Sequence, residues 1–181
     1  APSCPVMPVI NAFFMTIILV IFNVNMLLKI YLNLKYESDI LKKILITGSS
    51  GFIGKNLIDN LLSEYKIIGL SKNGKKSKLN HIIKDINKVT AKDFKNIFCV
   101  IHLAAITDPK ICEDFPEKCI TTNVSGTQKI LEAARKNNCK VIYASTSHVY
   151  GIPKKIPISE TASTSPTSIY AGSKLAGEIL C

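Results

Sequence analysis

The stretch KILITGSSGFIG, Lys43 to Gly54, decides how the rest of this chain is interpreted. It opens with a short apolar run, Ile44 to Ile46, which is rich in β-branched side chains and is typical of a buried parallel strand. Three glycines then recur at intervals of three residues, and an amphipathic run predicts a helix from Ile53 to about Glu64. The stretch therefore predicts a strand, a glycine-rich turn and a helix in succession.

The turn has the spacing Gly48-x-x-Gly51-x-x-Gly54, which indicates a binding site for a pyrophosphate. Glycine lets the backbone approach the anion closely, and the N–H groups at the start of the following helix favour negative charge. An ordinary glycine-rich turn has the same pattern, so the rest of the chain must decide between the two. If the turn binds a phosphate, the residues that contact the cofactor here are Gly48, Ser50, Gly51, Phe52, Ile53 and Gly54.

Length and composition indicate one globular domain, since 47% of the 181 residues are hydrophobic and 20% are charged. Arg135 is the only arginine, so the net charge of +10 comes from scattered lysines. Because arginine and aromatic residues do not interleave, we expect a solvated surface and no nucleic-acid partner. The six cysteines form no C-x-x-C pair and no metal-ligand spacing, which predicts no metal site and unpaired thiols in a reducing, cytoplasmic setting.

The first forty residues differ from the rest. No charged residue occurs from Val6 to Leu28, a length that could cross a bilayer, and the lysines that follow would hold the next residues in the cytoplasm. A poorly structured or non-native extension is the alternative, because nucleotide-binding domains of this kind begin a few residues before the first strand. We therefore divide the chain into a hydrophobic segment, residues 1–40, and an NAD(P)-binding domain, residues 41–181.

The second predicted strand, Tyr65 to Leu70, ends where dinucleotide-binding folds place an acid against the adenosine ribose. Ser71 occupies this position, and Lys72 follows it. The missing carboxylate and the nearby lysines favour NADP slightly over NAD, because neither repels a ribose 2′-phosphate. A lysine-rich loop without this function is the alternative. We take Ser71 and Lys72 as cofactor-binding residues and leave both dinucleotides open.

A third predicted strand runs from His81 to Ile86 and carries Asp85 near its end. A carboxylate there can accept a hydrogen bond from the adenine amino group, or it can simply cap the next helix. We include Asp85 and Ile86 among the cofactor-binding residues.

The apolar run Phe98 to Leu103 predicts a fourth, fully buried strand. Small residues follow it, and a flat cofactor can lie against them, so Leu103, Ala104 and Ala105 are predicted to contact the dinucleotide. A histidine within an apolar run is more often a hydrogen-bonded core residue than a catalytic base, and we expect this of His102.

A long helical pattern, Pro116 to Asn138, precedes the fifth predicted strand, Lys140 to Ser145. Asn123 lies on this helix, where its amide could join neighbouring strand ends, and we include it with the cofactor-binding residues. Strands that alternate with helices in this order predict an α/β fold, a doubly wound parallel sheet of the Rossmann type with helices on both faces. The apolar face of the long helix is predicted to contain Ile120, Val124, Thr127, Ile130, Leu131 and Ala134.

A second group of functional residues follows the fifth strand. Ser145 and Thr146 stand at its carboxyl end, where open parallel sheets bind their ligands. Tyr170 and Lys174, in the pattern Y-x-x-x-K, share one face of a predicted helix. An ammonium group near a phenol favours the phenolate, so the pair predicts a general base near neutral pH. A surface pair of this spacing is common, but the glycine-rich turn and the two hydroxyls favour an active site.

From about Lys42 onward the chain resembles the extended short-chain dehydrogenases/reductases of the NAD-dependent epimerase/dehydratase family. Six motifs in the family's order carry this resemblance. The matching segments are TGSSGFIG (47–54), Asp85-Ile86, HLAA (102–105), NVSGT (123–127), STSHVYG (145–151) and YAGSK (170–174). Pro157, Glu160 and Pro166 match the loop that normally precedes the tyrosine.

The resemblance implies roles for the second group. Tyr170 would be the acid/base, Lys174 would bind the nicotinamide ribose and lower the pKa of the tyrosine, and Thr146 would hold the substrate hydroxyl. Family members mostly act on nucleotide sugars, and their 4,6-dehydratases place an Asp-Glu pair directly after the strand-end threonine. This chain has Ser147-His148 there. The resemblance therefore favours an epimerase or a ketosugar reductase, serving surface polysaccharide or glycan precursor synthesis, over a dehydratase.

The chain departs from the family in its length, since the family's substrate lobe normally follows the tyrosine helix but the sequence ends at Cys181. We expect this polypeptide alone to bind dinucleotide weakly and to turn over little or no nucleotide sugar. The full-length protein would be the enzyme and could form a homodimer. The alternatives are a non-catalytic dinucleotide-binding redox sensor or assembly module and a hydroxysteroid-type dehydrogenase.

Overall fold

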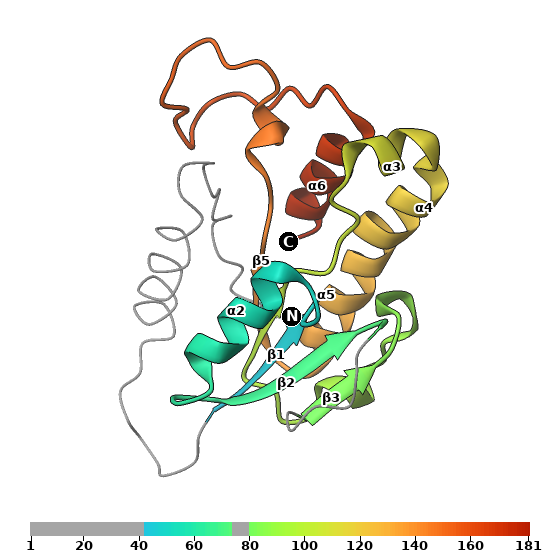
Figure 1. The fold of residues 1–181 in the computed structure, drawn as a ribbon, viewed down its shortest axis with the longest axis vertical. Coiled ribbons are helices and arrows are strands. Elements are labelled where there is room, and N and C mark those ends of the chain that lie inside the picture. The colour runs from blue at the N-terminus through green and yellow to red at the C-terminus, as the bar shows by residue number, and fades with distance from the viewer. Residues whose placement is uncertain (1–41, 74–79) are drawn as a thin grey trace.

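The computed structural model describes residues 42–73 and 80–181, and their centre is a parallel five-stranded sheet (Figure 1). The strands are β1 (Lys43–Thr47), β2 (Lys66–Ser71), β3 (Asn80–Ile83), β4 (Cys99–His102) and β5 (Lys140–Tyr143). They lie in the order β3-β2-β1-β4-β5, and each neighbouring pair is parallel. The chain thus moves outward from β1 to one edge and then to the other, which is the doubly wound topology predicted from the sequence.

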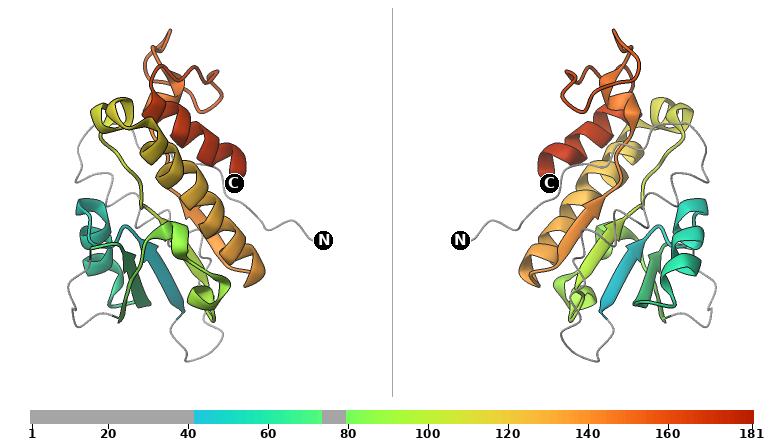
Figure 2. Two further views of the ribbon diagram at one scale, coloured as in Figure 1. Left: turned by 90° about the vertical axis from the view of Figure 1, so that its right-hand side faces the viewer. Right: turned by 90° about the vertical axis from the view of Figure 1, so that its left-hand side faces the viewer.

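Helices cover both faces of this sheet (Figure 2). They are α2 (Phe52–Leu61), α3 (Pro109–Asp114), α4 (Pro116–Ile120), α5 (Gly126–Lys136) and α6 (Ile169–Leu180), with a π-helical turn at Thr121–Ser125 and 3-10 turns at Ile86–Lys88, Ala91–Phe94 and Ser147–Tyr150. α4, the π-helical turn and α5 follow one another without a break. The long helix predicted from Pro116 to Asn138 is therefore one continuous segment that ends at Lys136.

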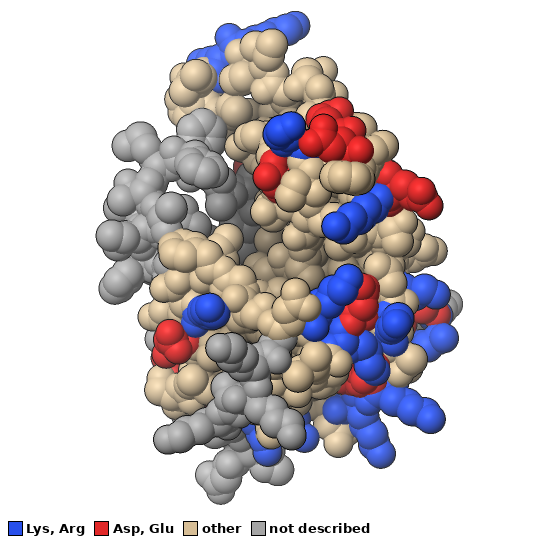
Figure 3. Space-filling model, turned by 45° about the vertical axis from the view of Figure 1, so that its right-hand side comes forward, with Lys and Arg blue, Asp and Glu red and all other residues tan. Residues whose placement is uncertain are grey.

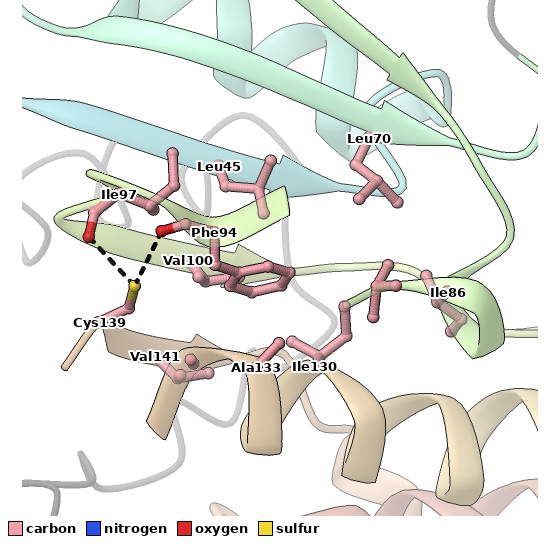
Figure 4. Close-up of a cluster of buried hydrophobic side chains, with 12 residues drawn as sticks. Leu45, Leu70, Ile86, Phe94, Ile97, Val100, Ile130, Ala133, Cys139 and Val141 are labelled. Carbon is pink, nitrogen blue, oxygen red and sulfur yellow. Dashed lines mark hydrogen bonds between the residues drawn. The ribbon is translucent and has the colours of Figure 1, made fainter. Parts of the chain in front are cut away.

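Two apolar cores hold the helices on the sheet. Side chains of a strand alternate between its faces, so Ile44 and Ile46 of β1 pack on the α2 side and Leu45 packs on the opposite side. On that opposite side, two side chains are fully buried: Phe94, at the end of a 3-10 turn, and Ile130 of α5 (Figure 4). Removal of this apolar surface from water stabilises the layered arrangement.

α2 is shorter than predicted. It ends at Leu61 rather than near Glu64, because the chain turns there and buries Tyr65 just before β2. Ile120, predicted on the buried face of the long helix, is 44% exposed. It lies at the end of α4, and the wide π-helical turn that follows changes the helical phase between it and the buried residues of α5.

β3 ends at Ile83, although the sequence pattern extends it to Ile86. Asp85 accepts a hydrogen bond from the backbone N–H of Asn87 at 2.9 Å and so starts a 3-10 turn. The carboxylate of Asp85 therefore caps this turn, which is one of the two roles predicted for it. The predicted bounds of the other strands agree with the structure to within two residues.

The prediction of unpaired thiols is wrong for two cysteines, since Cys112 of α3 and Cys119 of α4 form a disulfide. Their helices are separated in sequence by a single residue, Phe115, which lets the two side chains face each other across the bend. Among the described residues, Cys99, Cys139 and Cys181 form no disulfide.

The predicted membrane segment, residues 6–28, lies outside the described residues. Within residues 42–73 and 80–181, no helix combines the length and the apolar character needed to cross a membrane.

Candidate active site

The glycine-rich turn has the close backbone approaches that its sequence predicts. Gly48 has a φ of +68°, and a Cβ atom there would lie 2.9 Å from the backbone nitrogen of Ala104. Gly54 packs so closely on the carbonyl of Gly48 that a Cβ would overlap it. α2 begins directly after Gly51, and no side chain caps its first N–H groups. These groups are therefore available to an anion.

The remaining predicted residues of the turn are exposed. Ser50 is open to solvent, and the side chains of Phe52 and Ile53 are 64% and 57% exposed. Exposed apolar side chains beside an anion-binding helix start can contact the uncharged parts of a bound dinucleotide.

The loop after β4 lies against the turn. The N–H groups of Leu103 and Ala104 both donate to the hydroxyl of Thr47, at 3.1 Å each. Leu103, Ala104 and Ala105 are half-buried there. The structure thus brings the predicted residues after β4 next to Gly48, at the end of β1.

His102 is a core residue, as predicted, and is 1% exposed. Its Nδ1 lies 2.6 Å from Thr47 Oγ1, and its Nε2 lies 3.0 Å from Thr127 Oγ1. The Thr127 hydroxyl donates to the carbonyl of Asn123 at 2.6 Å, so it accepts from Nε2–H, and Nδ1 accepts from Thr47. Burial, reinforced by the charge of Lys174, lowers the pKa of His102 to about 3. The imidazole is therefore neutral and links a strand end to the long helix.

Asn123 is also 1% exposed, and its amide contacts protein groups. Oδ1 accepts from the N–H of Ile106 at 2.8 Å, and Nδ2 donates to the Ile106 carbonyl at 3.0 Å and to Ser173 Oγ at 2.9 Å. The amide thus joins the loop after β4 to α6. Because the side chain has almost no exposed surface, its amide has a positioning role, and its contact with the cofactor stays a prediction.

A serine-histidine cluster joins the carboxyl ends of β1 and β2 to His81, the second residue of β3. Nε2 of His81 is 3.0 Å from both Ser71 Oγ and Ser49 Oγ. Gly69 leaves room for the ring, since a Cβ there would lie 2.7 Å from it. The sequence did not reveal His81 as a partner of Ser71. Gly69 in β2, which leaves space for a large side chain on the neighbouring strand, was the signal that could have indicated it.

A cavity of about 340 Å³ lies beside this cluster, and its lining includes two predicted residues that form an ion pair. Lys72 Nζ is 3.4 Å from Asp85 Oδ2. Hydrogen bonds from Asn87, first from its backbone N–H, and the charge of Lys72 hold the pKa of Asp85 below its usual value. Ile86, also predicted to contact the cofactor, has its side chain in the core. The full lining is Lys72, Asp85, Asn87, Glu117, Lys118, Thr121 and Thr122.

Tyr170 stands in the first turn of α6 and is 9% exposed. Burial raises its pKa, and a hydrogen bond with the side chain of Thr146 offsets part of this effect. The expectation that Lys174 lowers this pKa is wrong for this structure. The ammonium group lies instead over the ring of Tyr143, 4.0 Å from its centre.

Lys174 is 5% exposed, and burial lowers its pKa to about 8. The charge of Glu178 acts in the opposite direction, and the same carboxylate accepts a hydrogen bond from Ser145. The hydroxyl of Ser145 therefore contacts α6.

The burial of Lys174 predicts a pH-dependent stability. Its pKa is about 8 in the folded chain and 10.5 ordinarily, so the cost of burying the charge is fully present below pH 8 and disappears between 8 and 10.5. The free energy of unfolding should rise by up to about 3 kcal/mol over this range. We expect Lys174→Met to be more stable at neutral pH and to lack this rise in denaturant titrations. Lys55→Met, at an exposed position, should keep it.

A second cavity, of about 350 Å³, lies next to the tyrosine. The ring of His148 stands edge-on to the ring of Tyr170, with 6.0 Å between the centroids. Both residues of the Ser147-His148 pair line the cavity. The two positions at which the family's 4,6-dehydratases have an Asp-Glu pair therefore face this space. The full lining is Ser147, His148, Gly151, Ile152, Pro153, Ile158, Thr167 and Ser168.

No group of three or more His, Cys, Asp and Glu side chains is arranged to hold a metal ion in the part of the chain that the structure describes.

Basic and acidic side chains are intermingled on the face shown in Figure 3.

The two halves of the site share one edge of the sheet. The glycine-rich turn follows β1, and the Thr146–Tyr170 pair lies beyond β5 and at the start of α6 (Figure 1). Because β1 and β5 belong to one parallel sheet, their carboxyl ends face the same side. An anion-binding helix start and a phenol acid/base on one edge suit a dinucleotide-dependent reaction.

Comparison with known proteins agrees with this arrangement. The UDP-glucose 4-epimerase of Mycolicibacterium smegmatis is 34% identical over 153 residues, which covers 75% of this chain and 49% of that protein. The structure of the UDP-N-acetylglucosamine 4-epimerase from Methanobrevibacter ruminantium in complex with UDP-N-acetylmuramic acid is 28% identical. It has a TM-score of 0.72 and covers 76% of this chain and 48% of that one.

A variant of a UDP-glucuronic acid 4-epimerase from Bacillus cereus, in complex with UDP-4-deoxy-4-fluoro-glucuronic acid and NAD, is 34% identical. Its TM-score is 0.70, and the match covers 77% of this chain and 51% of that one. The chain spans about half the length of these relatives. Residues 44–181 match the sequence profile of the NAD dependent epimerase/dehydratase family, and the chain therefore belongs to this family.

Proposed function

We propose that this chain carries the cofactor-binding and acid/base part of an NAD-dependent nucleotide-sugar epimerase. The observation that carries the proposal is the position of Tyr170, buried at the start of α6 on the same sheet edge as the glycine-rich turn. The relatives named above are UDP-sugar 4-epimerases, which supports a UDP-sugar as the substrate. Because the chain spans about half their length, the activity is proposed for the protein that contains this domain.

In this proposal Tyr170 exchanges a proton with a sugar hydroxyl, and Thr146 holds the same hydroxyl in place. The raised pKa of Tyr170 keeps the phenol protonated at neutral pH, which suits proton donation to a keto sugar. Proton removal needs a nearby positive charge. The ammonium group of Lys174 can supply that charge if its side chain turns away from Tyr143. The bound dinucleotide would accept and return a hydride at the sugar carbon.

An epimerase is favoured over a dehydratase by the side chains next to Thr146. Ser147 and His148 line the cavity beside Tyr170, and neither is a carboxylate that could remove a proton from a neighbouring sugar carbon.

NAD is proposed as the cofactor, although the sequence alone leans slightly towards NADP. Lys72, which could attract a 2′-phosphate, is paired with the carboxylate of Asp85 in the cavity near Ser71. A carboxylate beside the ribose would repel that phosphate. NAD in the Bacillus cereus complex supports the same choice.

The ion pair predicts the effect of removing the carboxylate. Asp85→Asn should free Lys72 and strengthen NADP⁺ binding relative to NAD⁺ binding by about threefold, or about 0.7 kcal/mol, since Lys72 is largely exposed. Titration calorimetry with both dinucleotides measures this. Asp59→Asn, an exposed site on α2, is the matched control and should leave both affinities unchanged. An equal change for both dinucleotides would contradict the assigned role.

The proposed function can be tested by following UDP-glucose and UDP-galactose in proton NMR spectra. The chain should be in excess over substrate, with and without NAD⁺, because we expect low turnover. Interconversion that requires NAD⁺ supports the epimerase. The same experiment on the protein that contains this domain decides between the two functions. Stoichiometric NAD⁺ binding there, without conversion of any UDP-sugar, would favour the dinucleotide-binding sensor or assembly module instead.

A further inference from the structure

The disulfide Cys112–Cys119 lies directly beneath the candidate acid/base. The two Cα atoms are 5.0 Å apart, and both side chains are fully buried. With Tyr170 they form one buried cluster, against which Ile106 and Ile169 pack. The disulfide, which bridges α3 and α4, therefore belongs to the packing that surrounds the tyrosine.

A second contact ties α3 to the tyrosine helix. Oε1 of Glu113, the residue next to Cys112, accepts a hydrogen bond from the backbone N–H of Ile169 at 2.9 Å. Ile169 is the first residue of α6 and precedes Tyr170. The start of α6 thus rests on the segment that the disulfide closes.

Cys119 reaches the same helix by another route. Its Sγ lies 3.5 Å from Nδ2 of Asn123, and this amide also donates to Ser173 Oγ at 2.9 Å. The Ser173 hydroxyl in turn donates to the carbonyl of Tyr170 at 2.7 Å. A change in the position of Cys119 therefore acts on a hydrogen-bond chain that ends at the backbone of Tyr170.

We infer that Cys112 and Cys119 form a reversible thiol–disulfide site whose oxidation state sets the position of Tyr170. Bonded sulfurs lie about 2.0 Å apart, whereas two thiols need roughly the 3.5–4.0 Å of a van der Waals contact. Neither cysteine is exposed, so the added separation has to be accommodated by the neighbours, which include the Tyr170 side chain.

The oxidant that this site takes is a low-molecular-weight disulfide, which reaches the buried cysteines when α3 and α4 open locally from α6. In the exchange, one cysteine thiolate attacks the small disulfide, whose S–S bond breaks and releases one small thiol. The second cysteine then attacks the mixed disulfide, forms the Cys112–Cys119 bond and releases the second small thiol. Two electrons and two protons pass from the cysteine pair to the oxidant, and a small thiol reverses the reaction. This chemistry does not depend on the proposed epimerase function.

The first measurement is the redox titration of the pair. The chain is equilibrated with mixtures of reduced and oxidised glutathione, quenched with acid, alkylated and analysed by peptide mass spectrometry. We expect Cys112 and Cys119 to change together at one ratio, while Cys99 and Cys139 are alkylated throughout after denaturation. A pair that stays fully reduced or fully oxidised at every ratio would overturn the inference.

The second measurement tests the coupling to Tyr170. In NMR spectra of the chain with isotope-labelled tyrosines, the Tyr170 signal is assigned by its loss in Tyr170→Phe. Reduction should shift this signal, whereas Tyr65, which packs in the α2 core on the other face of the sheet, should not move. A pair that exchanges without any shift of Tyr170 would refute the coupling.

Variants separate this pair from the other buried thiols. Spectra of Cys112→Ala/Cys119→Ala should not respond to glutathione, and Cys99→Ala/Cys139→Ala should respond as the wild type does. If a double variant does not fold, the wild-type titration and spectra in the two buffers still decide both parts of the inference.

Discussion

Acidification from about pH 7 to about pH 5 should lower the free energy of unfolding by about 2 kcal/mol, because His102 is buried as the neutral imidazole. Its pKa is about 3 in the folded chain and 6.5 ordinarily, so the unfolded chain binds the proton first. The contribution of the neutral His102 imidazole to the free energy of unfolding is complete above pH 6.5 and decreases as the pH falls towards 3. Over that full range it amounts to about 5 kcal/mol, which is comparable to the whole stability of a small domain.

Denaturant titrations at several pH values measure this slope. Most carboxylates ionise below this pH window, so they add little to it. His102→Gln should be less stable at neutral pH, since it loses the hydrogen bond from Thr47, but its stability should not fall over the same window. His148→Gln, at an exposed site, is the matched control and should keep the wild-type slope. An unchanged slope in His102→Gln would assign the acid sensitivity to another group.

Loss of the Tyr170 hydroxyl should slow the proposed hydride chemistry by about a thousandfold, within the range that a positioned acid/base contributes. Tyr170→Phe keeps the ring that packs against Cys112 and Cys119, so NAD⁺ binding should change by no more than about twofold. The measurement is the single-turnover appearance of reduced nicotinamide after mixing with stoichiometric UDP-sugar.

Two controls accompany this variant. Tyr65→Phe removes a hydroxyl from a buried tyrosine on the other face of the sheet, and it should react at the wild-type rate. Thr146→Val removes the group that hydrogen-bonds to Tyr170, and it should show an intermediate rate with an altered pH profile. Wild-type rates in Tyr170→Phe would show that the phenol does not transfer the proton.

Local patterns were enough to predict the framework of the molecule. Short apolar runs predicted the central strands β1 and β4, because a strand buried on both faces must be apolar throughout. The spacing of Gly48 and Gly54 predicted a turn that only glycine fits, because its constraints are backbone contacts between near neighbours and with the loop after β4. Boundaries were less certain where a cap or a turn ended an element, as Asp85 does after β3.

The sequence by itself therefore determined the doubly wound fold, the glycine-rich turn and the position of Tyr170 on the tyrosine helix, since these depend on periodicity and spacing. Only the tertiary structure decided which side chains meet: Cys112 with Cys119, Ser71 with His81, and Lys72 with Asp85. It also decided the protonation of the site. The pKa values of Tyr170 and Lys174 follow from burial, which arises only when α6 packs on the sheet and on α3 and α4, and no spacing along the chain encodes it.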